Sequence, residues 1–356
     1  MLYQLEFRPY QRPFQRALST SHGNWEIREG VILRLRDRTG KIGWGEIAPI
    51  PWFGSETLNQ ALNFCAQLGN EITTENIFSI PSQLPACQFG FESAWETLNK
   101  EAEPLATQEA EPPATRSQAE PGNEGDTGSQ AQPGNNLYEA LPRVNGKTLR
   151  FSGLLPTGEA ALQAWQPLWE QGYRTFKWKI AVASIEDELN IFKQLIETIP
   201  TEVKLRLDAN GGLNWESANE WLKMCDRFHI EFLEQPLPVD KFDAMLELSR
   251  CYFTPLALDE SVANIHQLQA CYQKGWQSIF VIKPCIAGSP QKLREFCHIN
   301  DIDLVFSSVF ETAIGRQFAL QLAAELSRCD RAIGFGVDRW FNDDEETWLN
   351  SLWNNH

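Results

Sequence analysis

Five short runs of apolar residues between positions 174 and 283 each end in a charged side chain. The runs are RTFKWK (174–179), VKLRLD (203–208), IEFLE (230–234), PLALD (255–259) and IFVIK (279–283). Their last residues are 29, 26, 25 and 24 positions apart, which is the length of a strand, a helix and two loops. Apolar runs that alternate with helical patterns predict parallel strands covered by helices. We therefore expect an α/β barrel over roughly 150–340.

The remaining parts of the barrel follow the same pattern. Strands are predicted at 148–155, 303–306 and 332–336. Helices are expected near 158–171, 184–198, 214–227, 240–250, 264–274, 287–299 and 312–327. Gly172 follows the first of these helices, where a glycine commonly ends a helix.

The first hundred residues predict a small α+β domain over 1–99, with strands first and helices after. Its strands are expected at 2–8, 30–36 and 41–47, with helices starting at 55–57 and covering 91–98. The polar, glycine-containing segment 18–25 is interpreted as a mobile loop. The apolar loop 49–55 is expected to pack on something, either a ligand or simply a neighbouring element.

Residues 100–136 differ sharply in composition from the rest of the chain. They contain one leucine, no aromatic residue, two basic residues and seven acidic residues, with many Pro, Gly, Gln and Ser. Such a segment buries too little apolar area to offset its ordering entropy. We interpret it as a disordered insertion, tolerated on the surface rather than used for recruitment, which leaves 137–356 as the barrel domain.

The overall charge narrows the class of partners. A formal net charge of −16 argues against nucleic acid or an anionic membrane, which require basic patches. No apolar run is long enough to span a membrane, and the start of the chain has no secretion-signal pattern. The eight cysteines form no CxxC pair and indicate reduced thiols in a cytoplasmic protein. The expected partner is a small molecule, and the sequence leaves the oligomeric state open.

Lys177 and Lys179 lie two residues apart on one strand, so their side chains share a face while Trp178 points into the helix layer. Inside a barrel, burial and mutual repulsion are expected to lower the pKa of such lysines, as a general base near neutral pH requires. The alternative is a pair of surface lysines on an edge strand.

Asp208, Glu234 and Asp259 each stand at the end of a strand. In a barrel these ends converge on one mouth, where three carboxylates would repel one another without a cation. Hard oxygen ligands suit Mg²⁺, with Mn²⁺ as a substitute. Each acid alone could instead cap a helix or occupy a turn.

Lys283 ends the strand about half a barrel away from Lys179 and is expected to enter the mouth from the opposite side. Gly288, Ser307 and Ser308 offer small side chains and backbone amides that can hold an anionic group of a substrate. Asn210 is a further candidate substrate-binding residue.

These motifs together resemble a known family. KWK, LDAN, EFLEQP, LDES, VIKP and SSVFET occur in the order and spacing of the enolase superfamily, in its muconate-lactonising-enzyme-like subgroup. Within that subgroup the chain most resembles the o-succinylbenzoate synthase family. The resemblance implies a modified TIM barrel of the (β/α)7β type with an N-terminal capping domain. The insertion at 100–136 departs from the family pattern.

The resemblance also implies a reaction, namely a Mg²⁺-dependent syn-elimination of water in menaquinone or phylloquinone biosynthesis. Lys179 would take the proton α to a metal-bound carboxylate, Lys177 would keep Lys179 poised, and Lys283 would assist from across the ring. The metal ligands would be Asp208, Glu234 and Asp259, and the segments 18–25 and 49–55 would close the mouth.

Two alternatives remain open at this point. An N-acylamino acid racemase or dipeptide epimerase of the same subgroup would use the same two lysines. Dipeptide epimerases of the subgroup carry an Asp-x-Asp at the last strand, whereas here Arg339 follows Asp338, which favours the synthase. A non-catalytic binding protein on the same scaffold would be expected to have lost one of the five charged residues, and all five are present.

Overall fold

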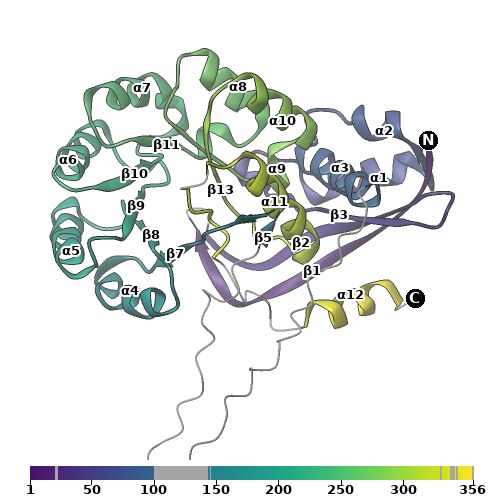
Figure 1. Cartoon of the computed structure of the whole chain (residues 1–356), viewed down its shortest axis with the longest axis horizontal. Coiled ribbons are helices and arrows are strands. Elements are labelled where there is room, and N and C mark those ends of the chain that lie inside the picture. Colours follow the sequence, from purple (N-terminus) through teal and green to yellow (C-terminus); the bar gives the residue numbers. More distant parts are fainter. Residues whose placement is uncertain are drawn as a thin grey trace, which may run out of the picture.

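The computed structural model describes residues 1–20, 23–99, 143–144, 146–328, 331–336, 341 and 344–354. It contains a four-stranded antiparallel sheet near the N-terminus and a curled seven-stranded parallel sheet (Figure 1). The predicted insertion at 100–136 lies outside the described residues. The predicted domain bounds, 1–99 and 137–356, stay a prediction.

The N-terminal sheet has the strand order β3-β2-β1-β4. Its strands are β1 (Leu2–Thr20), β2 (Gly23–Arg36), β3 (Ile42–Ile47) and β4 (Glu71–Thr73).

The prediction of a loop at 18–25 is wrong for residues 18–20 and 23–25, which pair as strands, while residues 21–22 lie outside the described residues. β1 and β2 form one long hairpin in which Leu18 still pairs with Trp25 and Thr20 with Gly23, beyond an irregularity after Pro13. The polar residues there are compatible with a strand whose tip needs no apolar face, so their composition did not reveal the pairing.

The helices of the N-terminal part cover one face of this sheet. They are α1 (Leu58–Leu68), α2 (Thr74–Phe78) and α3 (Pro85–Asn99), and a 3₁₀ turn η1 (Pro51–Phe53) precedes them. α3 lies directly on β3 because Gly43 and Gly45 have no side chain. A Cβ at Gly45 would lie 2.0 Å from the carbonyl oxygen of Gly90. The two glycines therefore allow the helix to approach the strand closely.

The parallel sheet confirms the predicted barrel strands in their chain order. They are β7 (Ser152–Leu155), β8 (Thr175–Lys179), β9 (Lys204–Asp208), β10 (Ile230–Glu234), β11 (Leu256–Leu258), β12 (Ile279–Ile282) and β13 (Asp303–Phe306). Helices lie on the outside of the sheet (Figure 1). They are α4 (Ala161–Glu170), α5 (Ile185–Thr198), α6 (Trp215–Cys225), α7 (Phe242–Cys251), α8 (Ile265–Gln273), α9 (Pro284–Ala287), α10 (Pro290–Ile299) and α11 (Ala313–Leu326).

Two details of the barrel differ from the prediction. The segment 332–336 is not a strand; it makes only isolated bridges, from Ile333 to Phe151 and from Gly334 to Ser307, which join the two edges of the sheet. The helix expected over 287–299 is interrupted at Gly288, whose φ of 112° no helix accommodates, and α10 restarts at Pro290.

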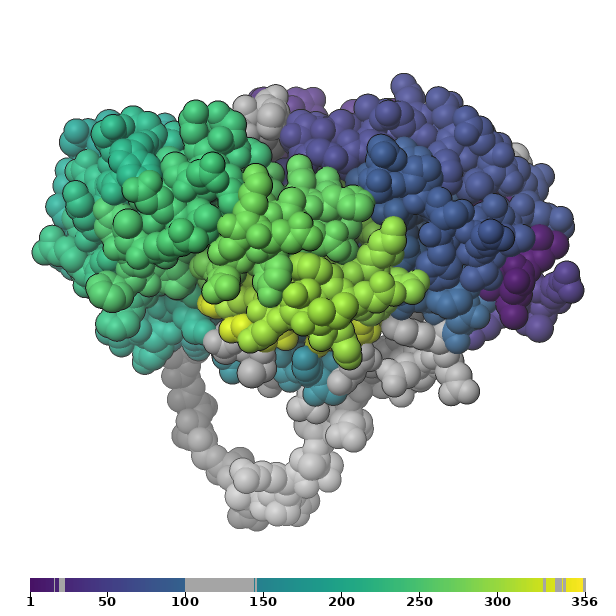
Figure 2. All heavy atoms as spheres, turned by 90° about the horizontal axis from the view of Figure 1, so that it is seen from above, coloured from purple at the N-terminus to yellow at the C-terminus, as the bar shows by residue number. Residues whose placement is uncertain are grey.

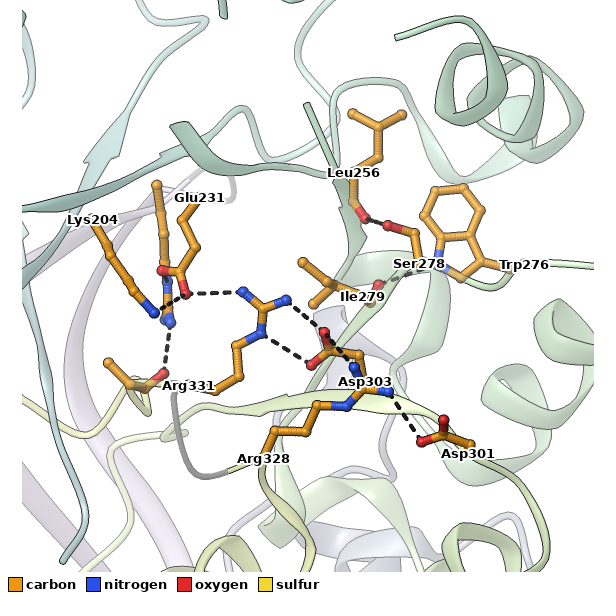
Figure 3. Close-up of polar contacts among 12 residues, drawn as sticks. Lys204, Glu231, Leu256, Trp276, Ser278, Ile279, Asp301, Asp303, Arg328 and Arg331 are labelled. Atoms are coloured by element: carbon orange, nitrogen blue, oxygen red, sulfur yellow. Dashed lines mark hydrogen bonds and ion pairs between the residues drawn. The ribbon is translucent and has the colours of Figure 1, made fainter. Parts of the chain in front are cut away.

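Ionic contacts hold the barrel together where the strand ladder is sparse. At the ends of the strands opposite the mouth, Arg331 donates to both carboxylate oxygens of Asp303 and, at 3.0 Å, to Glu231 (Figure 3). Glu231 also accepts a hydrogen bond of 2.7 Å from the buried Arg206, which bonds the carbonyl of Ala332. The closing segment is therefore attached to β10 and β13 through the side chain of Arg331, and to β9 through the carbonyl of Ala332.

We predict that Arg331→Met lowers the free energy of unfolding by about 3 kcal/mol, because Asp303 loses its two-pronged partner and Glu231 is left with Arg206. Arg328→Met is the matched control. Arg328 pairs with the exposed Asp301 at 3.0 Å and reaches Asp303 at 3.7 Å from a half-exposed position, and this substitution is expected to cost less than about 0.5 kcal/mol. Urea denaturation measures both. Equal losses for the two variants would contradict the role given to Arg331.

Candidate active site

The strand ends bring the predicted charged residues to one side of the barrel. Lys179 pairs in register with Asp208, and Asp208 pairs with Glu234. Glu234 is level with Ala257, so Asp259 stands two residues further along its strand. Trp178 is fully buried and meets Trp221 of α6 at 6.3 Å, which confirms that the side chains on either side of it face inward.

The three lysines have different partners. The Nζ of Lys177 lies 2.7 Å from Oδ2 of Asp208 and 2.7 Å from Oε1 of Glu234. Lys283 forms an ion pair with Asp259. Among the described residues, Lys179 forms no ion pair or hydrogen bond through its side chain. The amine of Lys179 is therefore the one available for other contacts.

The electrostatics of Lys177 differ from the expectation. Burial alone would lower its pKa, but the carboxylates of Asp208, Glu234 and Asp259 raise the pKa above the ordinary lysine value. The prediction that its pKa would be lowered is wrong, because three acids from neighbouring strands outweigh the effect of burial. Lys177 thus stays charged and neutralises its neighbours.

An excess of negative charge remains in the cluster. Burial, and after it the charge of Asp208, raises the pKa of Glu234 to about 8. Burial also acts to raise the pKa of Asp208, but Lys177 brings that pKa below the ordinary value. The charged form of Asp208 is therefore stabilised, whereas the charged form of Glu234 is not. A further cation nearby would stabilise the charged form of Glu234.

The donor set fits a hard divalent cation. Asp208, Glu234 and Asp259 are buried and supply only carboxylate oxygens, the donors that Mg²⁺ prefers. Within the part of the chain that the structure describes, no three His, Cys, Asp or Glu side chains form a metal-binding group. The ammonium groups of Lys177 and Lys283 engage these carboxylates. The metal assignment stays a prediction.

Two residues that were not predicted support the acids. Gln235 is fully buried, and its Oε1 accepts from the backbone N–H groups of Asp259 at 3.0 Å and Ser261 at 3.2 Å. Glu260 accepts from Asn210 Nδ2 at 3.1 Å, while its buried Oε2 has no hydrogen-bond partner among the described residues. Burial, and then the charge of Asp259, raises the pKa of Glu260 to about 7. In the sequence, the one feature that could have pointed to Gln235 and Glu260 is that each directly follows a predicted metal ligand.

Aromatic residues of the N-terminal sheet domain reach the same mouth. The ring of Phe53 lies 3.8 Å from the Nζ of Lys283. Trp25, at the hairpin tip, meets Trp52 at 5.0 Å and Phe310 of the β13–α11 loop at 5.7 Å. The prediction that the loop 49–55 packs on another element is confirmed.

The predicted substrate-binding residues lie in loops after strands. Ser307 donates its backbone N–H to the carbonyl of Ile282 at 2.9 Å, and the hydroxyl of Ser308 contacts both carboxylate oxygens of Glu311. Gly288 faces the N-terminal domain, where a Cβ would lie 3.0 Å from Oε1 of Gln88. Their contact with substrate stays a prediction.

Comparison with known proteins gives the family. The description "Enolase C-terminal domain-like" matches residues 159–350, and "MenC, N-terminal domain" matches residues 3–98. An o-succinylbenzoate synthase of Thermosynechococcus vestitus (strain NIES-2133 / IAM M-273 / BP-1) is 38% identical over 94% of this chain and 92% of its own length. The chain belongs to the o-succinylbenzoate synthase family of the enolase superfamily.

Further relatives and solved structures support this assignment to different degrees. The o-succinylbenzoate synthase of Bacillus subtilis (strain 168) is 24% identical over 88% of this chain and 78% of its own length. The crystal structure of o-succinylbenzoate synthase from Thermosynechococcus elongatus BP-1, complexed with Mg in the active site, has a TM-score of 0.79 at 36% identity and covers 99% of this chain and 100% of that one. A dipeptide epimerase from Enterococcus faecalis V583 has a TM-score of 0.71 at 20% identity, covers 93% of this chain and 89% of that one, and shows the enolase fold alone.

Strained backbone is concentrated at the mouth of this enolase-type barrel. The non-glycine residues with positive φ among those described are Ala181 (63°), Asn210 (43°), Gln235 (37°) and Phe310 (60°). They follow the ends of β8, β9, β10 and β13, and such strain is typical of functional sites. The geometry and the family thus indicate the same end of the barrel.

We predict that Gln235→Ala costs about 2 to 3 kcal/mol of stability, because two buried backbone N–H groups lose their acceptor. The same change should weaken the affinity for Mg²⁺ by displacing Asp259. Gln60→Ala is a matched control, since Gln60 also accepts a backbone N–H, at 2.8 Å, but in an exposed helix cap. Urea denaturation and calorimetric Mg²⁺ titration measure the two effects. Unchanged Mg²⁺ affinity in Gln235→Ala would contradict this role.

Proposed function

We propose that this chain removes water from 2-succinyl-6-hydroxy-2,4-cyclohexadiene-1-carboxylate and releases 2-succinylbenzoate, a precursor in menaquinone or phylloquinone biosynthesis. The observation that carries the proposal is the cluster at the barrel mouth. In it, lysines from β8 and from the end of β12 surround buried carboxylates in a chain of the o-succinylbenzoate synthase family. The chain is accordingly a hydro-lyase.

Lys179 is the proposed base. Its uncharged amine takes the proton from the ring carbon that bears the carboxylate, and the electron pair of that C–H bond forms the new ring double bond. The ammonium then gives the same proton to the departing hydroxyl on that face, so that water leaves and Lys179 is uncharged again. Lys177, held by Asp208 and Glu234, keeps its charge throughout and contributes positive charge beside Lys179.

Asp208, Glu234 and Asp259 are the proposed ligands of a Mg²⁺, with Mn²⁺ as the expected substitute. When bound, this ion supplies Lewis-acid stabilisation of the negative charge that grows on the substrate carboxylate. Gly288, Ser307, Ser308 and Asn210 are the proposed contacts for the rest of the substrate.

Lys283 acts from the opposite side of the site. Its ammonium is held by Asp259 and by the ring of Phe53 at 3.8 Å, so it can attract the substrate ring from the face away from Lys179. Phe53, Trp52 and Trp25 cover the mouth from the N-terminal domain and exclude water.

Racemisation of an N-acylamino acid is the second candidate, and the presence of lysines on two different strands, Lys179 on β8 and Lys283 just after β12, favours it. A lysine on each side serves both faces of an α carbon, as a racemase or epimerase needs. Asp338 and Arg339, whose pattern speaks against a dipeptide epimerase, lie outside the described residues. Comparing kcat/KM for the cyclohexadiene acid and for an N-succinylamino acid separates the two reactions. A higher value for the amino acid would overturn the dehydration proposal.

The proposed partner is a small carboxylate in the cytoplasm. The net charge of −16 supports neither a nucleic-acid nor an anionic-membrane partner. None of the helices described in the structure is both long and apolar enough to cross a membrane.

We predict that Lys179→Ala and Lys283→Ala each lower kcat for dehydration by about 10³-fold, because a proton-transfer or charge-stabilising group is lost. Lys193→Ala, on the exposed face of α5, is the control and should retain full activity. Circular dichroism checks that each variant is folded. Near-normal turnover in a folded Lys179→Ala variant would remove Lys179 from the mechanism.

Removal of the metal is expected to stop the reaction. Excess EDTA should abolish turnover, and added Mg²⁺ should restore it. Asp208→Asn should weaken Mg²⁺ binding by at least about tenfold, since a charged ligand is lost. Calorimetric titration with Mg²⁺ measures the affinity directly. Turnover that is insensitive to chelation would argue against the metal site.

A further inference from the structure

One fully buried carboxylate outside the reaction site connects the two parts of the chain. Glu46 lies on β3 of the N-terminal sheet, but its contacts are with α11 of the barrel. It accepts hydrogen bonds from the backbone N–H of Thr312 at 2.9 Å, from the hydroxyl of Thr312 at 2.5 Å and from the N–H of Gly315 at 3.0 Å. Tyr10 of β1 donates its hydroxyl to the same carboxylate at 2.5 Å.

The first turn of α11 depends on acceptors from outside the barrel. Thr312 precedes the helix, but its hydroxyl donates to Glu46 and does not cap its own helix. The next N–H, of Ala313, donates at 2.8 Å to Glu345 of α12 (Glu345–Asn354), and Glu345 is paired with Arg12 of β1. The positive end of the helix dipole is thus neutralised by carboxylates that the N-terminal sheet supports.

The position of Glu46 requires space that only glycine provides. A Cβ at Gly315 would lie 2.7 Å from Oε2 of Glu46. Gly315 is inside α11, where glycine is unfavourable by about 1 kcal/mol relative to alanine. The helix therefore has a residue of low helix propensity at the point where the carboxylate approaches.

The loop that leads into this helix turn is the one with the proposed substrate-binding serines. Glu311 fixes the loop from within, accepting from the N–H of Val309 at 2.7 Å and from the hydroxyl of Ser308. Phe310, in its strained conformation, reaches Trp25 across the domain boundary. Figure 2 shows the light-green to yellow-green part of the chain, which includes α10 and α11, lying between the teal and green barrel residues and the blue N-terminal residues.

We propose that Glu46 is a positioning residue that sets substrate affinity by fixing the β13–α11 loop when the N-terminal domain packs on the barrel. Packing of the domain and ordering of the loop are then one event, because the same carboxylate takes part in both. The effect on the substrate rests on the proposed function, whereas the ordering of the loop does not.

Glu46→Gln tests the proposal with little change in side-chain volume. The amide replaces one accepting oxygen by an NH₂ group that faces N–H donors, so the loop should loosen. We expect KM to rise about tenfold with kcat nearly unchanged, the pattern of an interaction made equally in the ground and transition states. Hydrogen exchange of residues 307–316 should become faster in the same variant.

Glu56→Gln is the matched control. Glu56 is also a buried carboxylate at a helix N-terminus, and it accepts from the N–H groups of Ala86 at 3.1 Å and Cys87 at 2.7 Å, but α3 belongs to its own domain. This variant should lose stability while KM and the exchange of residues 307–316 stay at wild-type values. Thr312→Val removes only one donor to Glu46 and should raise KM by a smaller factor. This variant replaces Glu46→Gln in the test if Glu46→Gln does not fold.

The exchange and kinetic measurements can each overturn the role proposed for Glu46. Unchanged exchange of residues 307–316 in Glu46→Gln, or in Thr312→Val if the first variant is unfolded, would overturn the proposal. So would a fall in kcat at constant KM. If the wild-type chain does not dehydrate the cyclohexadiene acid, the proposed function fails, while the exchange measurement still tests the role of Glu46.

Discussion

The balance of buried charge at the barrel mouth is the constraint on which the rest of the site depends. Asp208, Glu234 and Asp259 repel one another in a poorly solvated place, and Lys177 and Lys283 offset part of that repulsion. This gives the two lysines of β8 separate tasks. Lys177 stays charged between two acids, while Lys179, two residues further along the strand, keeps an amine without an ionic partner among the described residues.

The two ends of the barrel meet different requirements. At the end of the barrel opposite the mouth, Arg206 and Arg331 join the segment 331–336 to three strands, so these arginines and their carboxylates are paired with one another. At the mouth, Gln235 and the strained loops hold acids that are only partly neutralised. The N-terminal domain then covers this end and, through Glu46, supports the first turn of α11. Stability and chemistry are thus kept at opposite ends of one sheet.

The sequence predicted those features of the fold that depend on local patterns of residues. The barrel strands and their charged ends follow from apolar runs of regular spacing, and the structure has them in that order. It could not predict features whose partners are distant in the chain. The bridges at 333 and 334 and the raised pKa of Lys177 depend on contacts between segments far apart. The hairpin tip at 18–25 is a local pairing, which its polar composition concealed. Glu46 carried no signal either, because its role is defined by a helix whose contacting residue, Thr312, is 266 positions further along the chain.

A crystal structure of the chain with Mg²⁺ and 2-succinylbenzoate tests the central claim most directly. We expect one Mg²⁺ at about 2.0 to 2.1 Å from oxygens of Asp208, Glu234 and Asp259. We also expect Lys179 Nζ within about 3.5 Å of the ring carbon that bears the carboxylate, with Lys283 on the opposite face. A Mg²⁺ bound away from these acids, or both lysines on the same face of the ring, would contradict the proposed mechanism.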